Sequence, residues 1–349
     1  MDTLANIYPQ IHSFENLYLA YRKARKGKRG KVSVAAFEFN QEEELLRLRD
    51  ELRAEAWQPG AYHSFHIHDP KRRLISAAPF RDRVVHHALC NLLEPFWERR
   101  FIFDSYANRT GKGTHRAILR AHQFARRYKF VLQCDLEQFF PSIDHALLQA
   151  ELARYIHDPQ TLGLAGRILA SGEGVLADEY APRWFPGDGL FAPLRPRGLP
   201  IGNLTSQFWA NVYLSPFDHF VMRELRAPAY LRYVDDFLLF GDDKAALWQH
   251  AQAIQNRLAR LRLSLHPPQV YPVATGIPFL GFRLYPSHRR LKRKRGLAFE
   301  RRFGRLHRRY LAGEMERARL DASARSWAAH AAWGDTTGLR RAVLGKYPL

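Results

Sequence analysis

Two adjacent carboxylates lie between two apolar runs of this 349-residue chain. The stretches from Ala229 to Tyr233 and from Phe237 to Gly241 are strand-like, and Asp235 and Asp236 fall where the chain must turn between them. Unpaired buried charge is costly, so apolar strands normally exclude neighbouring carboxylates. The pair therefore indicates a counter-ion, most simply a divalent metal.

A third carboxylate, Asp135, ends the apolar run that starts at Phe130, a pattern typical of a buried strand. Phosphoryl transfer to a 3′-hydroxyl needs two divalent ions about 4 Å apart. Aspartate oxygens suit Mg²⁺, which keeps water and substrate phosphate in its shell. We expect Asp135, Asp235 and Asp236 to be catalytic and to bind two Mg²⁺ ions, which requires the fold to bring them together.

Two aromatic rings follow Asp135, and one of them could wall a sugar pocket. A bulky ring there would exclude the 2′-hydroxyl of a ribonucleotide sterically. Phe139 and Phe140 could both be core residues instead. We expect one to be core and choose Phe140 as the gate.

The charge balance favours a polyanionic partner. Lys and Arg number 54 against 34 Asp and Glu, a formal charge of +20. Such an excess repels itself in a compact protein unless a partner neutralises it. Nucleic acid is the first candidate and an acidic membrane surface the second. For any basic chain, a structural role in a ribonucleoprotein is the alternative. The basic block from Arg22 to Lys31 could be a solvated loop or could contact phosphate.

Cysteine usage and the N-terminus indicate a cytoplasmic protein. Cys90 and Cys134 are far apart, so we expect free buried thiols rather than a disulfide or a zinc site. No signal peptide is visible before Gln10, and no apolar run approaches the ~20 residues that cross a bilayer. We therefore expect no membrane partner.

Apolar periodicity predicts the elements that must position these groups. Helices are expected within residues 1–54 (including 41–52), at 81–96 with an end near Pro95, at 203–221, at 244–263, and in the basic segment from 287 onward. Strands are expected at 62–68, 130–136 and 277–284, and loops at 171–198. The first strand contains three histidines, which could build a metal site but more simply form a wet strand face.

The order of these segments resembles a reverse transcriptase of the bacterial retroelement type. The matching segments run in family order over roughly residues 60–290: 71–75 with 79–85, 105–115, the Asp135 segment, 198–207, 233–236 and 279–282. The resemblance implies an α+β right-hand polymerase with fingers, an antiparallel-sheet palm and a short helical thumb. The expected domains are an N-terminal helical extension (1–54), fingers (55–127), palm (128–150), a fingers or loop insertion (151–197), palm (198–288) and a basic helical thumb (289–349).

The resemblance also assigns site residues. It places nucleotide binding at Lys71, Arg72, Arg73, Phe140, Ile201, Gly202 and Gln207. Which of Lys71, Arg72 and Arg73 grips the triphosphate stays open. Primer and template binding falls on Phe279, Leu280, Gly281, Arg293, Lys294 and Arg295. A lysine that can protonate pyrophosphate is usual where this chain has Gln269, so His266, a neighbouring base or water would take that role.

One segment narrows the resemblance. Most reverse transcriptases have Gln-Gly followed by Ser-Pro, whereas this chain has Ile201-Gly202 and then Ser206-Gln207. That form is similar to the enzymes of diversity-generating retroelements, which copy a template RNA with errors concentrated at adenines. Ile201 cannot make the hydrogen bond that a glutamine could, and losing a directed bond weakens discrimination. Alternatively, Ile201 merely packs and Gln207 caps or bridges the helix.

The narrower resemblance implies partners: a template RNA, a cDNA or DNA primer, deoxynucleotides, and a small basic accessory variability protein that forms an oligomer. The alternative within the family is a retron-like or antiphage-defence reverse transcriptase. The end at Leu349 leaves no room for a maturase or endonuclease domain, so a complete group II intron protein is not expected. A dead polymerase kept as an RNA chaperone would be expected to lack one or more of the three aspartates, yet all are present.

Overall fold

The computed structural model describes residues 3–68 and 72–347, which form two compact units. Unit 1 comprises Met1–Phe103, Asp135–Leu225 and Gln252–His266. Unit 2 comprises Asp104–Cys134, Arg226–Ala251 and Pro267–Leu349. Lys71, one of the three candidate triphosphate contacts, lies outside the described residues.

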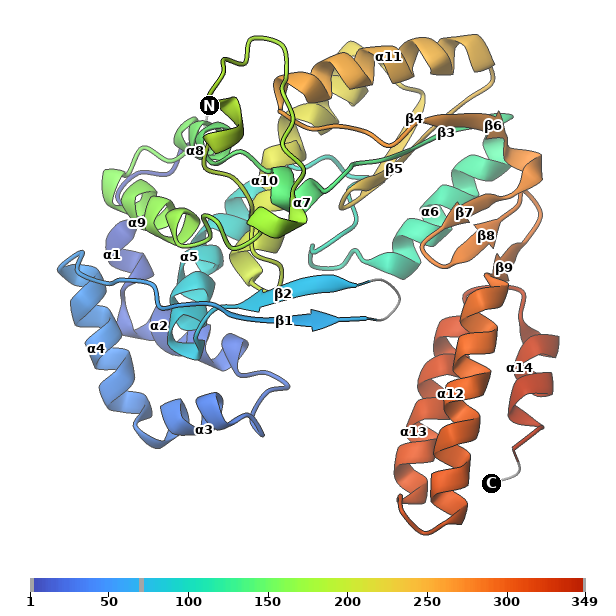
Figure 1. The fold of residues 1–349 in the computed structure, drawn as a ribbon, viewed down its shortest axis with the longest axis horizontal. Helices are drawn as coiled ribbons and strands as arrows, with labels where there is room; N and C mark the ends of the chain where they lie inside the picture. Colours follow the sequence, from blue (N-terminus) through green and yellow to red (C-terminus); the bar gives the residue numbers. More distant parts are fainter. Residues whose placement is uncertain (1–2, 69–71, 348–349) are drawn as a thin grey trace. The chain divides into compact units, whose positions relative to one another are not determined.

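Unit 1 is mainly helical, with one two-stranded ribbon (Figure 1). Its helices are α1 (Tyr8–Ile11), α2 (Phe14–Ala24), α3 (Val32–Phe39), α4 (Gln41–Arg53), α5 (Phe80–Glu98), α7 (Phe139–Ser142), α8 (His145–Ala153), α9 (Pro159–Ala170) and α10 (Leu204–His219), followed by a π-helical turn, η3 (Phe220–Glu224). Short 3-10 turns occur at η1 (Ala177–Glu179) and η2 (Ala192–Leu194). The ribbon pairs β1 (His63–Ile67) with β2 (Arg73–Ala77) antiparallel.

The predicted helices of unit 1 are confirmed, with one wrong boundary. We expected a helix end near Pro95, but α5 continues to Glu98 with Pro95 inside it. Proline removes one backbone donor, yet Phe96 and Trp97 are 3% and 1% exposed, so the last turn is held by its burial. The Trp97 ring lies 5.9 Å from that of Phe208 in α10. Tertiary packing thus outweighs the local preference for a helix end.

Helix α1 is tied to α9 through Asp158, a buried carboxylate that caps α9. Asp158 accepts hydrogen bonds from the backbone N–H groups of Ile7 at 2.7 Å, Tyr8 at 2.8 Å and Thr161 at 3.2 Å. Burial raises the pKa of Asp158, but these hydrogen bonds outweigh burial and the net pKa lies below its ordinary value. The carboxylate form is therefore the one that stabilises unit 1.

We expect Asp158→Ala to lower the free energy of unfolding by about 3 kcal/mol, because buried donors lose a charged acceptor. A folded-state pKa below the unfolded value means that this stability is fully present above pH ~4. It is lost as pH falls through the folded-state pKa. Urea unfolding at pH 7 and pH 3 checks this: the deficit should shrink at pH 3, while Asp178→Ala, at an exposed site, should show none at either pH.

Unit 2 contains the larger sheet, with strands in the order β4-β5-β3-β6 (Figure 1). The strands are β3 (Phe130–Asp135), β4 (Ala229–Tyr233), β5 (Asp236–Gly241) and β6 (Gln269–Pro272), the last followed by the 3-10 turn η4 (Val273–Thr275). The β4–β5 and β3–β6 pairs are antiparallel. Helix α6 (Thr114–Arg127) packs on this sheet, with Phe124 5.5 Å from Phe240 between ring centroids. Helix α11 (Lys244–Arg260) follows β5 and continues into unit 1.

A second, three-stranded antiparallel sheet corrects two expectations. The stretch 277–284, expected as one strand, is a hairpin of β7 (Ile277–Phe279) and β8 (Phe282–Leu284). Leu280 and Gly281 have φ values of +45° and +93°, and two consecutive positive φ values reverse the chain. The segment from 287, expected to be helical, begins instead with a short strand, β9 (Arg289–Leu291), paired with β8.

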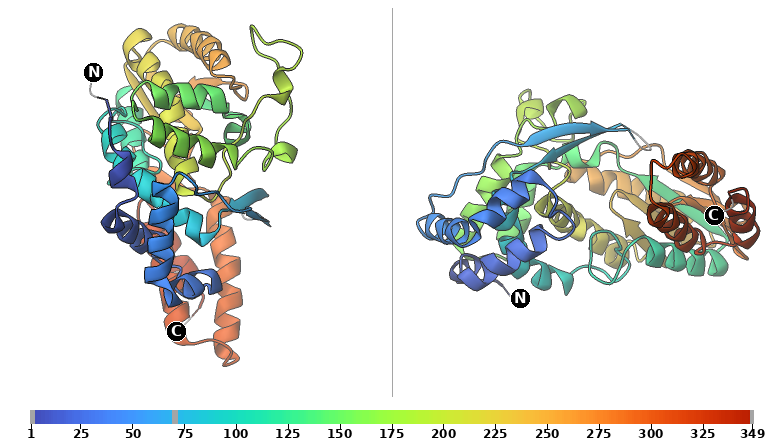
Figure 2. Two further views of the ribbon diagram at one scale, coloured as in Figure 1. Left: turned by 90° about the vertical axis from the view of Figure 1, so that its left-hand side faces the viewer. Right: turned by 90° about the horizontal axis from the view of Figure 1, so that it is seen from below.

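The C-terminal part of unit 2 is a bundle of α12 (Arg293–Leu311), α13 (Arg317–Ala331) and α14 (Thr337–Leu344), which lie side by side (Figures 1 and 2). Phe299 of α12 stacks on Trp327 of α13 with centroids 4.2 Å apart. Apolar residues of the basic tail therefore pack these helices together.

The mixture of helices and antiparallel sheets agrees with the α+β class, whereas the division into fingers, palm and thumb stays a prediction. Cys90 and Cys134 are both buried and, as expected, are not joined in a disulfide. Over the described ranges, no helix has the length and apolar character needed to pass through a membrane.

Candidate active site

Asp235 lies in a two-residue turn between β4 and β5, and Asp236 is the first residue of β5. Tyr233 pairs with Asp236 across the hairpin, so Val234 and Asp235 form the loop. Val234 has φ +59°, a conformation that is strained for a β-branched residue and normally taken by glycine. Strain of this kind persists where the surroundings over-determine it and collects at functional sites.

A buried arginine, Arg232, donates a hydrogen bond to that turn. Arg232, in the middle of the apolar strand β4, is only 1% exposed. Its Nη1 donates to the carbonyl oxygen of Val234 at 3.0 Å. Its backbone pairs with the segment before α6, donating to Asp104 O at 2.9 Å and accepting from Tyr106 N at 3.0 Å. The guanidinium therefore holds the strained turn through the Val234 carbonyl oxygen.

Asp135 is the last residue of β3, the strand next to β5 in the sheet order, and it is exposed. This confirms the predicted strand contexts of all three aspartates. Within unit 1, the carbonyl oxygen of Asp135 accepts a hydrogen bond from the backbone N–H of His266 at 3.0 Å. The next residues continue this pairing, since Glu137 N donates to Ser264 O at 2.9 Å.

His266 thus lies beside Asp135, and its side chain meets an acid. Nδ1 of His266 is 3.4 Å from Oε1 of Glu137. The other carboxylate oxygen of Glu137, Oε2, forms an ion pair with Arg183. Gln269, the residue found where a lysine is usual, begins β6 in unit 2 and is exposed. Whether His266, a neighbouring base or water protonates pyrophosphate stays a prediction.

The two aromatic rings after Asp135 differ in burial. The chain enters α7 through Gln138, which has φ +45°. Phe139 is 3% exposed and belongs to the core, whereas Phe140 is half-buried. The carbonyl oxygen of Phe140 accepts from Leu199 N at 2.9 Å, which ties this segment to the one that carries Ile201. Phe140 as the sugar gate stays a prediction.

The Ile201 segment is fastened to β2, the strand that begins with Arg73. Ser76 N donates to the Ile201 carbonyl oxygen at 2.8 Å. The buried Asn203 side chain accepts from Ala78 N at 3.0 Å and donates to Ser76 O at 2.9 Å. The structure therefore brings two predicted nucleotide-binding segments together within unit 1.

Gly202 is the residue that permits this close approach. Its φ is +122°, and a Cβ built on it would lie 3.0 Å from Cγ2 of Ile75 and 3.5 Å from the Ser76 carbonyl oxygen. No other residue type has this freedom of backbone conformation at so little cost. Gln207 follows in the first turn of α10 and is half-buried.

Two further candidates for triphosphate contact are Arg73, the first residue of β2, and Arg72, which precedes it. Arg73 is exposed, and Arg72 is hydrogen-bonded to Nε2 of His66 at 2.9 Å. Every residue of β1 is exposed, which confirms the wet-strand interpretation of its histidines.

The predicted primer-binding residues gather in unit 2. Phe279 is fully buried, and Leu280-Gly281 forms the turn of the β7–β8 hairpin. The Gly281 carbonyl oxygen accepts from Lys292 N at 3.0 Å, and a Cβ on Gly281 would collide with the Arg295 side chain. Arg293, Lys294 and Arg295 are all exposed at the start of α12. The hairpin turn and this basic helix start therefore form one local surface.

Two residues that sequence reasoning missed lie within electrostatic range of Asp236 in unit 2. Burial raises the pKa of Tyr271, and the Asp236 carboxylate raises it further. Burial lowers the pKa of Lys292, while Asp236 acts in the opposite direction. Tyr271 also donates to Gln133 Oε1 at 2.7 Å, and Gln133 donates to Pro278 O at 3.1 Å. Burial is not visible in the sequence, where Lys292 is one of a run of basic residues, so no local pattern singled it out.

Asp135, Asp235 and Asp236 would offer an ion only carboxylate oxygens. In the part of the chain that the structure describes, no group of three or more His, Cys, Asp or Glu side chains could by itself enclose a metal. Three aspartates at strand ends offer hard oxygen ligands without such a cage. That suits Mg²⁺, which completes its shell with water and substrate phosphates.

A known family model matches more than half of the chain. The family model described as reverse transcriptase (RNA-dependent DNA polymerase) matches residues 67–284. Protein YkfC of Escherichia coli (strain K12) is 27% identical over 283 residues, which are 69% of this chain and 71% of that protein.

Two further relatives are linked to introns by name. Group II intron-encoded protein LtrA of Lactococcus lactis subsp. cremoris is 23% identical over 229 residues, 64% of this chain and 36% of LtrA. Nuclear intron maturase 2, mitochondrial, of Arabidopsis thaliana is 26% identical over 186 residues, 48% of this chain and 25% of the maturase. The chain spans about a third or less of the length of these two relatives.

Proposed function

The chain belongs to the reverse transcriptase family and is an RNA-directed DNA polymerase, a nucleotidyltransferase, and from this premise we propose its narrower role. It copies the template RNA of a diversity-generating retroelement into adenine-mutagenised cDNA. Its other partners in this role are deoxynucleotides, a primer and a small basic accessory protein.

The observation that carries the proposal is the Ile201-Gly202 segment with Ser206-Gln207 after it. Three hydrogen bonds hold this segment at the end of β2: Ser76 N donates to the Ile201 carbonyl oxygen, and the Asn203 side chain accepts from Ala78 N and donates to Ser76 O. Ile201 therefore cannot drift away from the nucleotide-binding strand, and its side chain offers only apolar contact. A site that lacks a directed hydrogen bond discriminates less between substrates.

For the chemistry, we propose that Asp135, Asp235 and Asp236 hold two Mg²⁺ ions together with the substrate triphosphate. When bound, the ions supply activation of the primer 3′-hydroxyl and charge neutralisation at the leaving group. The chain's own contribution is to fix the carboxylates. Arg232 braces the Val234-Asp235 turn, and the backbone pairing of Asp135 with His266 fixes the end of β3.

The roles of the basic residues follow from their exposure. Arg73 lies on the ribbon strand fastened to the Ile201 segment, which supports triphosphate contact by Arg73 within unit 1. Arginine suits this role because its guanidinium donates bidentately to phosphate. The Gly281 turn and the adjacent start of α12, with Arg293, Lys294 and Arg295, are proposed to hold the primer and template backbone.

Sequencing of cDNA made on a defined RNA tests the narrower role. We expect errors of the native enzyme to concentrate at template adenines, and Ile201→Gln to lower that error frequency about five-fold. A neutral hydrogen bond contributes ~1 kcal/mol, which corresponds to that factor. Ile201→Leu is the matched control, since it keeps apolar contact and should keep the adenine errors. Errors spread evenly over all four template bases would instead support a retron-like or antiphage-defence enzyme.

A further inference from the structure

The loop before the Ile201 segment exposes large apolar side chains. Within residues 184–194, Trp184 is 60% exposed, Leu190 81%, Phe191 75% and Leu194 77%. Figure 2 (left) shows this yellow-green loop standing out from the helices of unit 1. Single exposed apolar residues are ordinary on a protein surface. Four within eleven residues are a patch of the kind that marks an interaction site.

The loop is held in shape rather than loose. Asp188 forms an ion pair with Arg195 and accepts from Phe185 N at 2.8 Å. Arg262, after α11, pairs with Asp144, the N-cap of α8, and lies 3.8 Å from Asp188. The Arg195 guanidinium holds the pKa of the Asp188 carboxyl below its ordinary value. A preformed patch loses less entropy when a partner binds.

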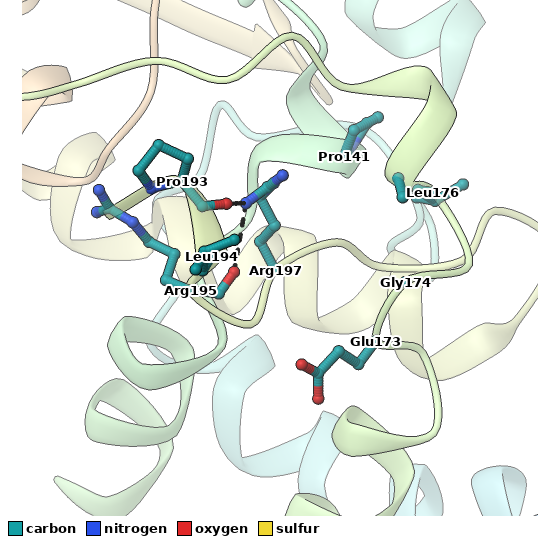
Figure 3. A pocket seen from close by; sticks show the side chains of 9 residues that line it. Pro141, Glu173, Gly174, Leu176, Pro193, Leu194, Arg195 and Arg197 are labelled. Atoms are coloured by element: carbon teal, nitrogen blue, oxygen red, sulfur yellow. Dashed lines mark hydrogen bonds between the residues drawn. The ribbon is translucent and has the colours of Figure 1, made fainter. Parts of the chain in front are cut away.

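A hollow of about 210 Å³ lies at the base of the patch (Figure 3). Pro141, Leu176, Pro193 and Leu194 supply apolar lining, and Glu173 supplies a carboxylate. Glu173 is exposed, and Figure 3 shows it apart from the arginines of the hollow. The hollow can take one apolar side chain of a partner, with a cationic group near Glu173.

The charge of the loop differs from that of the chain. Residues 172–197 contain four acids (Glu173, Asp178, Glu179 and Asp188) and three bases (Arg183, Arg195 and Arg197), a net of −1 within a chain of +20. Two of these acids, Glu173 and Asp178, are exposed, and exposed carboxylates repel phosphate. A basic partner surface is therefore the complementary one.

The arginines of the loop are also occupied. Arg183 pairs with Glu137, and Arg195 with Asp188. Arg197 donates to the Pro193 carbonyl oxygen and lies 4.0 Å from the Tyr180 ring centroid, a contact within the loop itself. The cations that would hold a nucleic-acid backbone are thus used internally, and a protein partner is favoured over RNA.

We propose that the surface formed by Trp184, Leu190, Phe191 and Leu194, with Glu173 at its base, docks a protein that presents a basic surface with apolar side chains. The inference rests on the proposed function in one respect: the partner is taken to be the small basic accessory protein named there. The docking surface itself is a new assignment, separate from the polymerase chemistry.

The test measures the affinity of the purified full chain for the purified accessory protein. A variant with Trp184, Leu190, Phe191 and Leu194 all changed to serine should bind at least ~30-fold more weakly, because the apolar contact is lost. Glu173→Lys should weaken binding through charge reversal, most strongly at low salt. The matched control, Phe39→Ser with Leu311→Ser, removes side chains that are 90% and 69% exposed elsewhere, and should bind normally. Extension of a primed RNA by the chain alone should be unchanged in all variants.

Three results would overturn the docking assignment: no binding of the accessory protein to the native chain, equal binding to the serine variant, or loss of RNA binding in that variant instead. A change of oligomeric state in the serine variant without loss of accessory binding would point to a second copy of the chain as the occupant, which also contradicts the proposal. A photo-cross-linker at position 191 gives a second readout and should label the accessory protein, whereas one at position 39 should not.

The failure of the docking surface and that of the proposed function are distinguishable. An adenine-biased error spectrum with unchanged binding by the serine variant would leave the function intact and reject the surface. An even error spectrum would reject the function whatever the binding result.

Discussion

Asp235→Asn should abolish extension of a primed RNA template while leaving template binding largely intact. The change keeps the size of the side chain and removes its charge, so the strained turn of Val234 and the brace from Arg232 can persist. Loss of an ionised ligand should cost about 4 kcal/mol of transition-state stabilisation, a rate loss of at least ~10³-fold. Single-turnover extension on a labelled primer, with filter binding of the same duplex, measures both quantities.

Asp321→Asn is the matched control for this variant. Asp321 is a surface acid in α13 that pairs with Arg317 at 3.8 Å, one helical turn away. A surface pair of this kind contributes little to stability, so extension should equal that of the native chain. Undiminished extension by Asp235→Asn would refute the catalytic assignment. Loss of duplex binding by the same variant would indicate a structural role for the carboxylate instead.

Gly202→Ala should lower both stability and extension sharply. Alanine at φ +122° is strained by about 1–3 kcal/mol. Its Cβ would also press on Ile75 at 3.0 Å, and overpacking costs a further ~1–3 kcal/mol. The Ile201 segment and β2 would then separate, which should reduce extension by at least ~10-fold under conditions where the variant is still folded. Thermal unfolding and extension at a temperature well below the midpoint separate the two effects.

Gly174→Ala distinguishes backbone strain from the loss of this contact. Gly174 also has a positive φ, +73°, but no atom lies within 4 Å of the position where its Cβ would be. It should lose some stability and keep its activity. Equal loss of extension in both variants would mean that the close approach of Gly202 to Ile75 has no special role.

Of the eight non-glycine residues with positive φ in the described part of the chain, three lie beside predicted site residues. Gln138, Val234 and Leu280 have positive φ values without being glycine, and they lie after Asp135, before Asp235 and in the primer-binding turn. Local propensity would not select valine or leucine for these conformations. Such conflicts between local preference and fold are expected at functional sites, where the surrounding structure maintains them.

The sequence alone determined the polymerase family and the strand contexts of the three aspartates. An acidic pair between two apolar runs has few stable solutions other than a hairpin turn, so Asp235 and Asp236 could be placed without coordinates. The same holds for Asp135, since the apolar run before it indicated a strand and β3 ends at that residue. Apolar periodicity likewise predicted α2, α4 and α12.

What only the tertiary structure decided depends on contacts between residues far apart in the chain. The continuation of α5 past Pro95 depends on the burial of Trp97 against residues more than fifty positions away, including Phe208. The attachment of the Ile201 segment to β2 depends on hydrogen bonds between residues about 125 positions apart. In the sequence, Arg232 is a charged residue within an apolar strand, and only the structure shows that it donates to the Val234 carbonyl oxygen. Local patterns report which face of an element is apolar, but they carry no information about which distant backbone group will satisfy a buried donor.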